Sequence, residues 1–371
     1  MAEAPSNGEV VIRTANLSKT YRTGLEQFFR QPGVTALREL NLEVYRGEVF
    51  ALIGPNGSGK TTTLKLLMGL IFPSVGTVEV FGCDPKANTE VKRRLGFMPD
   101  GPYFYGHLNG YELLEFYGGL LGMSKEMIQR RVAELLEQLE MTTRAKQRVR
   151  TYSKGMLQRI GLAHALLNNP EIIFMDEPTS GLDPVGTRDM HLIVRQMKAE
   201  GKTVFLCSHF LTEIEDLCDR VILLDRGRTL QYGALDELLA EPGKMRLAAS
   251  GLDAASRERV AAMGRCLEAR GDDAVQVVLA DGPDVSAAIG VVQTAGGHLD
   301  SLAPMRRTLE EVFMESVERQ AADRPWEDGD ADRGLAGLVR HETADEAQAE
   351  AEAEPETELE PDAELAQKEG D

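Results

Sequence analysis

The stretch GPNGSGKT at residues 54–61 constrains the fold more than any other part of the sequence. It follows VFALI, a wholly apolar run of strand length, and precedes TTTLKLLMGLI, whose apolar residues recur with helical spacing. This pattern, G-x-x-x-x-G-K-[ST], is typical of a phosphate-binding loop that joins a buried parallel strand to a helix. An ordinary glycine turn is the plainer alternative, and the strand and helix on either side disfavour it.

The loop chemistry explains these residue types. Glycines let backbone N–H groups curl around phosphate oxygens, a lysine adds positive charge, and the hydroxyl after it can ligate Mg²⁺. We therefore expect Lys60 to contact phosphate and Thr61 to bind the metal. The whole predicted nucleotide cradle is Gly54, Pro55, Asn56, Gly57, Ser58, Gly59, Lys60, Thr61 and Thr62.

Two acidic residues follow the apolar run IIFM at residues 172–175. Asp176 is predicted to contact Mg²⁺, and Glu177 is predicted to orient the attacking water. Unpaired buried charge is costly, so two acids at the end of a buried strand favour a functional reading. A salt-bridged strand end is the plainer alternative.

The rest of the first 240 residues reads as an α/β sheet. Strand-length runs at 9–16, 40–46, 171–176, 203–208 and 220–225 are separated by stretches with helical spacing, which predicts crossover helices. Residues 111–145 are helical throughout, so a helical insert of about 101–165 is expected to interrupt the sheet.

A second, smaller α/β domain is predicted for residues 241–319. Its strands are weaker (MRLAAS, AVQVVLA), and helices are expected in ASRERVAAMGRCLEAR and VSAAIGVVQTAG. In the final PMRRTLEEVFMESV, Thr308 and Glu311 have capping-box spacing before an apolar face. From 320 to 371 the chain is rich in Ala, Glu, Asp and Pro, which predicts a disordered acidic tail.

Composition excludes several other classes of protein. The formal charge of −19 is concentrated at the end, where residues 342–371 hold 13 Asp or Glu against one Lys. We expect no basic stripe, which argues against nucleic-acid binding as the main task. The four cysteines form no C-x-x-C pair, which fits a reducing compartment. We also expect no signal peptide and no membrane-spanning segment, because the longest apolar runs are far short of ~20 residues.

A second stretch, YSKGM at residues 152–156, again combines small residues and a glycine before a helix pattern. Together with the motifs above, it resembles the ATP-binding subunits of ABC transporters, over roughly residues 10–240. In that family the signature of one subunit closes over ATP on the P-loop of another. The resemblance therefore implies that Ser153 and Gly155 contact ATP held by a second copy in a head-to-tail homodimer.

Other motifs occur in the family's order. Tyr21 resembles the aromatic residue that stacks on adenine, SGLD at 180–183 resembles the dimer-contact loop, and His209 resembles the histidine that reaches the γ-phosphate. Taken alone, Tyr21 would be read as a packing aromatic and His209 as a strand-end histidine. The family's common signature, L-S-G-G-Q, is replaced here by YSKGM, which is familiar among exporters of drugs, lipids and polysaccharides. Where the family carries Gln or Glu, this chain offers Asp100, whose shorter side chain would reach Mg²⁺ through water.

The resemblance implies an ATP- and Mg²⁺-dependent ATPase that drives a separate transmembrane permease as an exporter. Catalysis would use Glu177, His209 and Lys60. The protein would lie peripherally on the cytoplasmic face of a prokaryotic plasma membrane. Two alternatives remain: a soluble ABC ATPase without a permease, and a regulatory module whose tail recruits a basic partner or merely keeps the protein soluble. The segment RTGLEQFFRQPGV at 22–34 is either an ordinary loop or a short amphipathic helix.

Overall fold

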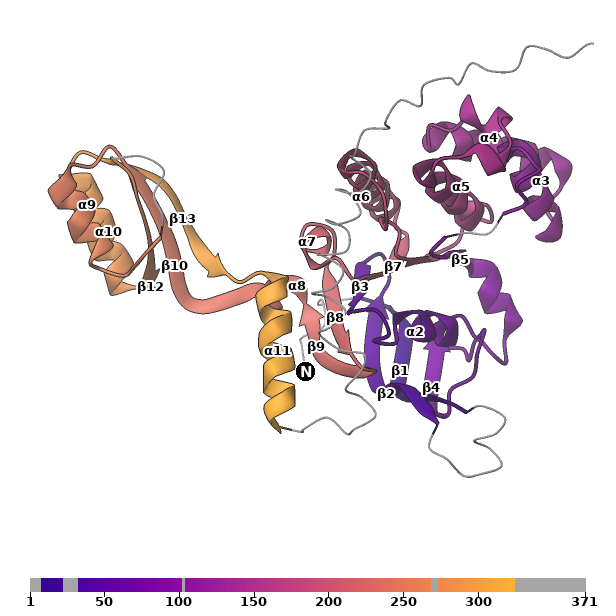
Figure 1. Cartoon of the computed structure of the whole chain (residues 1–371), viewed down its shortest axis with the longest axis horizontal. Coiled ribbons are helices and arrows are strands. Elements are labelled where there is room, and N and C mark those ends of the chain that lie inside the picture. The colour runs from indigo at the N-terminus through magenta and orange to yellow at the C-terminus, as the bar shows by residue number, and fades with distance from the viewer. Residues whose placement is uncertain (1–7, 23–32, 102–103, 268–272, 324–371) are drawn as a thin grey trace, which may run out of the picture.

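The computed structural model describes residues 8–22, 33–101, 104–267 and 273–323 (Figure 1). Most of the segment considered for an amphipathic helix, 23–32, and most of the expected acidic tail, 324–371, lie outside the described residues. No helix in the described ranges is both long and apolar enough to cross a bilayer.

A six-stranded sheet in the order β5-β6-β7-β3-β8-β9 forms the centre of the protein. Its first five strands are parallel, and β9 pairs antiparallel with β8. The apolar runs in the sequence become its buried strands, because a parallel sheet is covered on both faces. The strands are Leu95–Met98 (β5), Ile172–Asp176 (β6), Thr203–Ser208 (β7), Val49–Ile53 (β3), Arg220–Asp225 (β8) and Arg228–Ala234 (β9).

One face of this sheet packs against a second, antiparallel sheet and helix α2. The second sheet has the order β2-β1-β4, with strands Val34–Tyr45 (β2), Val10–Tyr21 (β1) and Val75–Val80 (β4). Helix α2, Lys60–Leu67, follows the glycine-rich loop. Alternate residues of β3 divide between the two cores: Phe50 and Leu52 join this core, while Val49, Ala51 and Ile53 face the other side.

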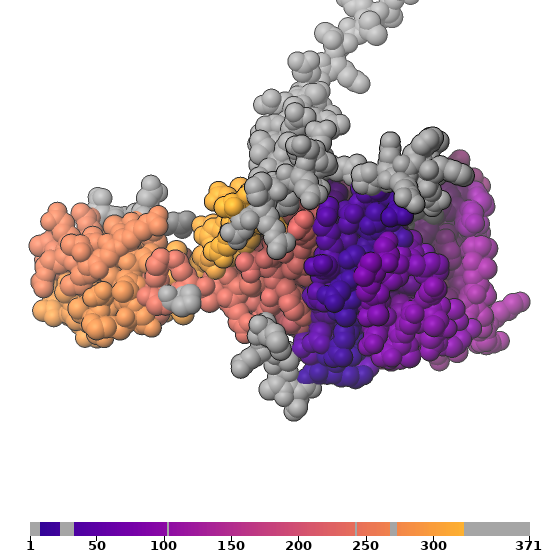
Figure 2. Space-filling model, turned by 90° about the horizontal axis from the view of Figure 1, so that it is seen from below, coloured from indigo at the N-terminus to yellow at the C-terminus, as the bar shows by residue number. Residues whose placement is uncertain are grey.

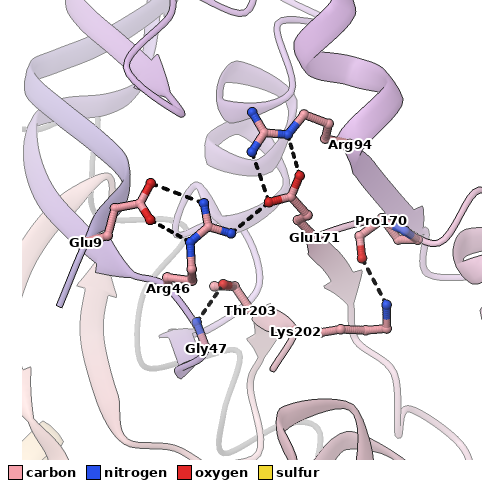
Figure 3. Close-up of polar contacts among 8 residues, drawn as sticks. All are labelled: Glu9, Arg46, Gly47, Arg94, Pro170, Glu171, Lys202 and Thr203. Carbon is pink, nitrogen blue, oxygen red and sulfur yellow. Dashed lines mark hydrogen bonds and ion pairs between the residues drawn. The ribbon is translucent and has the colours of Figure 1, made fainter. Parts of the chain in front are cut away.

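A polar network joins the ends of strands from both sheets (Figure 3). Arg46 donates to Glu9, just before β1, at 2.7 Å and to Glu171, just before β6, at 2.7 Å. Arg94 also donates to Glu171, at 2.5 Å, and both guanidinium groups lie over the Phe81 ring. The Arg94 hydrogen bond lowers the pKa of Glu171 to about 2 despite opposing burial. The network therefore fixes one sheet against the other.

The predicted helical insert lies between β5 and β6. The 3-10 turn Thr89–Arg94 (η1) precedes β5, and Asn109 begins the first insert helix with a capping box that involves Glu112. The remaining turns, Arg144–Lys146 (η2) and Val149–Thr151 (η3), precede α5. The helices are Gly110–Leu120 (α3), Lys125–Gln138 (α4) and Lys154–Leu166 (α5).

Three further helices complete this part of the chain. Helix α6 spans Pro184–Ala199 and begins with Asp183, whose side chain accepts from the Gly186 amide. The short helices α7, Leu211–Ile214, and α8, Leu235–Leu239, flank β8 and β9 in the sequence. The buried side of α6 joins the same core as α5 and one face of the central sheet.

A four-stranded antiparallel sheet forms a lobe that projects from the rest of the protein (Figure 2). Helices α9 and α10 cover one of its faces and share a separate core with it (Figure 1). The sheet order is β11-β12-β10-β13. The elements are Ala240–Ser250 (β10), Ala254–Ala261 (α9), Arg265–Leu267 (β11), Val275–Ala280 (β12), Pro283–Thr294 (α10) and His298–Arg306 (β13).

One sequence prediction in this lobe is wrong. The stretch ASRERVAAMGRCLEAR was expected to be one helix, but α9 ends at Ala261 and Arg265–Leu267 is a strand paired with β12. Gly264 lies so close to the neighbouring strand that an added Cβ would be 2.2 Å from the Val278 carbonyl oxygen. The glycine allows the chain to leave the helix and join the sheet edge.

The last described helix, α11 (Leu309–Asp323), begins with the predicted capping box. Glu311 accepts from the Thr308 amide at 2.9 Å, and the Glu311 amide donates to the Thr308 hydroxyl at 3.2 Å. Its buried Leu309, Val312 and Phe313 belong to the core beneath the central sheet and not to that of the lobe. The helix also continues through residues 320–323, where the sequence predicted the tail to begin.

Candidate active site

The glycine-rich loop is shaped by the packing of its own chain. It joins β3 to α2, and an added Cβ at Gly54 would lie 2.1 Å from the Leu224 carbonyl oxygen. Gly59 has φ +109° and would place a Cβ 2.5 Å from the Ala36 carbonyl oxygen. The loop is tied down where the Gly227 amide donates to the Ser58 carbonyl at 2.9 Å. Larger residues at Gly54 or Gly59 would displace backbone.

Lys60 is buried in the predicted phosphate site. Its Nζ donates to the Gly54 carbonyl at 2.7 Å and lies 3.1 Å from Glu177 Oε1, and the side chain is only 6% exposed. Gly59, the N-cap residue of α2, has no side chain that could accept from the first amides of the helix. A buried cation beside a helix N-terminus is suited to bind an anion.

Asp176 and Thr61 lie together at the end of β6. The Thr61 hydroxyl donates to Asp176 Oδ2 at 2.9 Å, while Asp176 Oδ1 is buried without a hydrogen-bond partner among the described residues. Burial raises the pKa of Asp176, and the charges of Glu177 and Asp100 add to the increase. A cation would satisfy the open oxygen and offset this charge, so the pair fits Mg²⁺.

No group of three or more His, Cys, Asp or Glu side chains in the described ranges is arranged to hold a metal ion. Mg²⁺ commonly uses one or two protein oxygens together with phosphate oxygens and water, which matches the Thr61 and Asp176 pair. Asp100 is exposed and acts on Asp176 through its charge. Its predicted place among the metal ligands stays a prediction.

Glu177 is held in a strained backbone conformation by contacts on both sides. Its φ is 49°, in the left-handed region that non-glycine residues rarely adopt, and such strain is concentrated at functional sites. Glu177 Oε2 lies 2.7 Å from His209 Nδ1 and accepts from the His209 amide at 3.3 Å. Burial acts to raise its pKa, but His209 and Lys60 together hold the pKa below its ordinary value. The carboxylate is therefore kept charged.

The structure brings together only part of the predicted site. Lys60, Thr61, Asp176, Glu177 and His209 are linked by the contacts above. Tyr21 lies at the end of β1, 41% exposed, with Lys19 Nζ 5.1 Å from its ring centroid. Within the described ranges, no hydrogen bond or ion pair connects the glycine-rich loop to Ser153 or Gly155.

Residues 153–156 instead border an open hollow of about 750 Å³, here called the signature hollow. Ser153 caps α5 by accepting from the Met156 amide at 3.3 Å. The side chain of Lys154 lies against Gly181, whose ideal Cβ would be 2.2 Å from Lys154 Nζ. Sequence reasoning missed this contact, because no local pattern shows that residues 180–183 fold back onto the start of α5.

A strand ending in Asp and Glu, a buried lysine in a glycine-rich loop and a supporting histidine define a P-loop ATPase. Residues 37–180 match the ABC transporter family. The chain is 40% identical to an uncharacterized ABC transporter ATP-binding protein of Nostoc sp., over 85% of this chain and 92% of that protein. It therefore belongs to the ATP-binding proteins of ABC transporters. It is the ATP-binding subunit of such a transporter and an ATPase.

Other relatives and solved structures extend this comparison. The daunorubicin resistance ATP-binding protein DrrA3 of Streptomyces coeruleorubidus is 34% identical over 75% of this chain and 90% of that protein. A dimeric ATP-binding cassette solved in a post-hydrolysis state with ADP and Pi superimposes with a TM-score of 0.54 at 28% identity. That match covers 60% of this chain and 98% of the solved chain. The mixed α/β fold is thus that of an ABC cassette.

Proposed function

We propose that this chain hydrolyses ATP as a homodimer and drives a separate transmembrane permease that exports its substrate. Two ATP molecules would lie between the copies, each held by the P-loop of one and the signature of the other. The observation that carries this proposal is the separation of the site. At the P-loop end Lys60, Asp176 and Glu177 are buried. Ser153 and Gly155 instead border an open hollow, and within the described ranges no hydrogen bond or ion pair joins them to the P-loop.

The Lys60 contacts suggest how binding prepares the site for hydrolysis. In the structure Lys60 neutralises Glu177 across 3.1 Å. A γ-phosphate that enters the loop competes for the lysine charge, which frees Glu177 Oε1 to accept a hydrogen bond from water. His209 keeps the other Glu177 oxygen in place at 2.7 Å. Glu177 then orients water for in-line attack, while Lys60 and His209 stabilise charge on the transferring phosphoryl group.

Different residues would hold the metal and the base of the nucleotide. Thr61 and Asp176 would hold Mg²⁺, which supplies charge neutralisation between the phosphates when it is bound. Asp100 would contact it through water. The exposed ring of Tyr21 would stack on adenine, with Lys19 beside it. Base stacking on an aromatic ring contributes about 1–3 kcal/mol by analogy with nucleic-acid binding.

Export is supported by relatives whose names include drug resistance and Nod factor export. A permease would supply the membrane passage, and the chain would act at the cytoplasmic face of the membrane. We further propose that residues up to about 240 form the cassette and that the lobe after it is an accessory domain. Since α11 packs in the cassette core, the accessory domain would end before Leu309 and not at 319.

Affinity purification from gently solubilised membranes tests this proposal. A tagged Glu177→Gln chain, which should bind ATP without hydrolysing it, is compared with tagged Lys60→Ala, and the masses of the intact complexes are measured. The expected result is an ATP-dependent dimer of Glu177→Gln together with a stoichiometric polytopic protein. Recovery only from the soluble fraction, as a dimer without a membrane partner, would favour the soluble mechanical ATPase.

A further inference from the structure

Although the composition predicted no basic stripe, one short run of cations, here called the basic strip, ends at the signature hollow. Between residues 144 and 154 the chain carries five cations: Arg144, Lys146, Arg148, Arg150 and Lys154. The first four alternate with other residues along η2 and η3. Ala145 and Val149 between them are buried, while all five cationic residues are exposed. The turns thus anchor an apolar side in the core and present the charges outward.

None of these five cations has an ion pair or a side-chain hydrogen bond within the part of the chain that the structure describes. Their neighbour Arg159 is different, because it is paired with Glu140 at 3.0 Å and Asp189 at 2.5 Å. The acids that line the signature hollow are Glu140, Asp183 and Asp189. Asp183 caps α6, so each of these three acids already has a partner.

The sequence contains a segment of complementary charge. In a chain of net charge −19, residues 350–360 read EAEAEPETELE and place a glutamate at every second position. The strip places a cation at every second position from Arg144 to Arg150. The two segments therefore carry charges of opposite sign, which attract each other.

The segment is long enough to reach the strip. Helix α11 ends at Asp323, and 26 residues separate it from Glu350. Fully extended, that length spans at most about 90 Å. A compact domain of the cassette's size has a radius of gyration of about 18 Å, so the tether exceeds its diameter.

We propose that residues 350–360 dock on the basic strip of the same chain. The docked segment would slow ATP hydrolysis, because it would obstruct the surface that carries the signature residues 152–156. A docked segment would place acidic side chains beside Lys154 and the signature hollow, where a second copy and its ATP phosphates must approach. This consequence rests on the proposed function, whereas the docking itself does not require ATP. Because the contacts are exposed, salt should weaken them: the screening length falls from ~10 Å at 0.1 M to ~3 Å at 1 M.

Zero-length carbodiimide cross-linking of the full chain tests the docking directly, since it joins lysine amines to carboxylates in contact. The expected result at low salt is links from Lys146 to the peptide containing residues 350–360. The variant Arg148→Glu/Arg150→Glu keeps Lys146 as the reporter and should reduce these links by at least about fivefold. The matched control, Arg246→Glu/Arg265→Glu, changes the net charge equally on exposed cations of the lobe and should leave the links unchanged.

Mixing light and heavy-isotope chains separates contacts within one chain from contacts between chains. Three results would each overturn the proposal. The first is tail links that join only differently labelled chains, and the second is tail links to Lys125, an exposed lysine of α4, in the same yield as to Lys146. The third is tail links to another protein alone. A second readout is ATP turnover. Replacing the six glutamates of 350–360 by Gln should raise it about fivefold at low salt if the tail is docked about four-fifths of the time.

The increase in ATP turnover should vanish at high salt. If the variant shows no increase at low salt, the proposed inhibition by the tail is wrong. The two readouts also separate this proposal from the proposed function. If Lys146 is cross-linked to the tail as expected but no variant hydrolyses ATP, the docking stands and the proposed function fails. If turnover is normal and Lys146 is not linked to the tail, the proposed function stands and the docking fails.

Discussion

Gly59 in the P-loop and Gly155 in the signature belong to opposite ends of the proposed ATP site. The backbone of Gly59 is left-handed, and an added Cβ would be 2.5 Å from a carbonyl oxygen of its own chain. At Gly155 an added Cβ would meet, among the described residues, only Leu182, at 3.7 Å, which is an ordinary contact distance. The fold of the single chain requires the first glycine but not the second.

The same contrast extends to the side chains around each glycine. At the P-loop end, Lys60 and His209 each contact a different oxygen of the Glu177 carboxylate. At the signature end, Ser153 and Lys154 are exposed on an open hollow. A site whose one end is preorganised and whose other end lies open is what a subunit that completes its site with a second copy should look like. Four substitutions test this comparison.

The largest effect is expected for Glu177→Gln. The amide keeps the shape and a contact with His209 but cannot act as a base, so hydrolysis should fall by about 10³-fold, or ~4 kcal/mol. ATP binding should persist. Steady-state phosphate release and nucleotide retention measure the two effects. Glu48→Gln is the control, because Glu48 is also buried beside the central sheet but lies outside the site, bonded to the Tyr45 amide at 2.8 Å. Equal turnover by Glu177→Gln and the control would contradict the assigned role.

Lys60→Ala should affect binding and folding together. ATP affinity should fall at least about 10²-fold, ~2.7 kcal/mol, because the phosphates lose a buried charge. The nucleotide-free chain should also lose about 2 kcal/mol of unfolding free energy, since Glu177 keeps a buried charge without its partner. Denaturant titration measures this, and the double variant Lys60→Met/Glu177→Gln should recover much of it. An unchanged unfolding free energy for Lys60→Ala would contradict the conclusion that the ion pair between Lys60 and Glu177 stabilises the folded chain.

Gly155→Ala should separate activity from folding. The free chain should keep its stability, or gain up to about 1 kcal/mol, because alanine suits a helix better than glycine. ATP hydrolysis should fall by about tenfold or more, ~1.4 kcal/mol, since the methyl group would stand where the phosphates of a second copy approach. Denaturant unfolding and turnover measure the two effects. A chain that unfolds on this substitution would contradict the comparison.

Mixing Gly155→Ala with Lys60→Ala chains sharpens the same test. Each variant alone has a defect in both of its composite sites. In a mixed dimer, one site combines both defects and the other is intact. The mixture should therefore hydrolyse more ATP than either variant alone, and no gain on mixing would contradict a site shared between chains.

The two ends also differ in how far sequence could predict them. The P-loop and the strand before Asp176 were predicted because a buried parallel strand needs an unbroken apolar run, and the loop residues form one continuous motif. The contact between Lys154 and Gly181 joins segments about 27 positions apart and leaves no local pattern. Four strands of the central sheet (β3, β6, β7 and β8) were likewise visible in the sequence, whereas β5, β9 and β13 were missed. The residues of β13 are mostly exposed and lack a clear alternation.

Helix α11 shows the same limit for packing between distant segments. Its capping box and apolar face were predicted correctly from Thr308, Glu311 and the residues between and beyond them. An amphipathic pattern indicates that a face is buried but not what covers it. That Phe313 packs into the cassette core and not the lobe could be learned only from the fold.

Ser153→Ala should cost less stability than Lys60→Ala, and it has a close internal control. Ser153 caps α5 and Ser124 caps α4, each by accepting from the amide three residues later at 3.3 Å. Loss of either cap should cost about 1 kcal/mol of unfolding free energy. Only Ser153→Ala should also reduce ATP turnover, by about tenfold or ~1.4 kcal/mol, because only this hydroxyl is proposed to meet a phosphate of the second copy. The difference between the two variants isolates the role that Ser153 has outside its own chain. Equal turnover in both would leave Ser153 as a helix cap alone and would place the contacts to the partner's ATP elsewhere on the signature face.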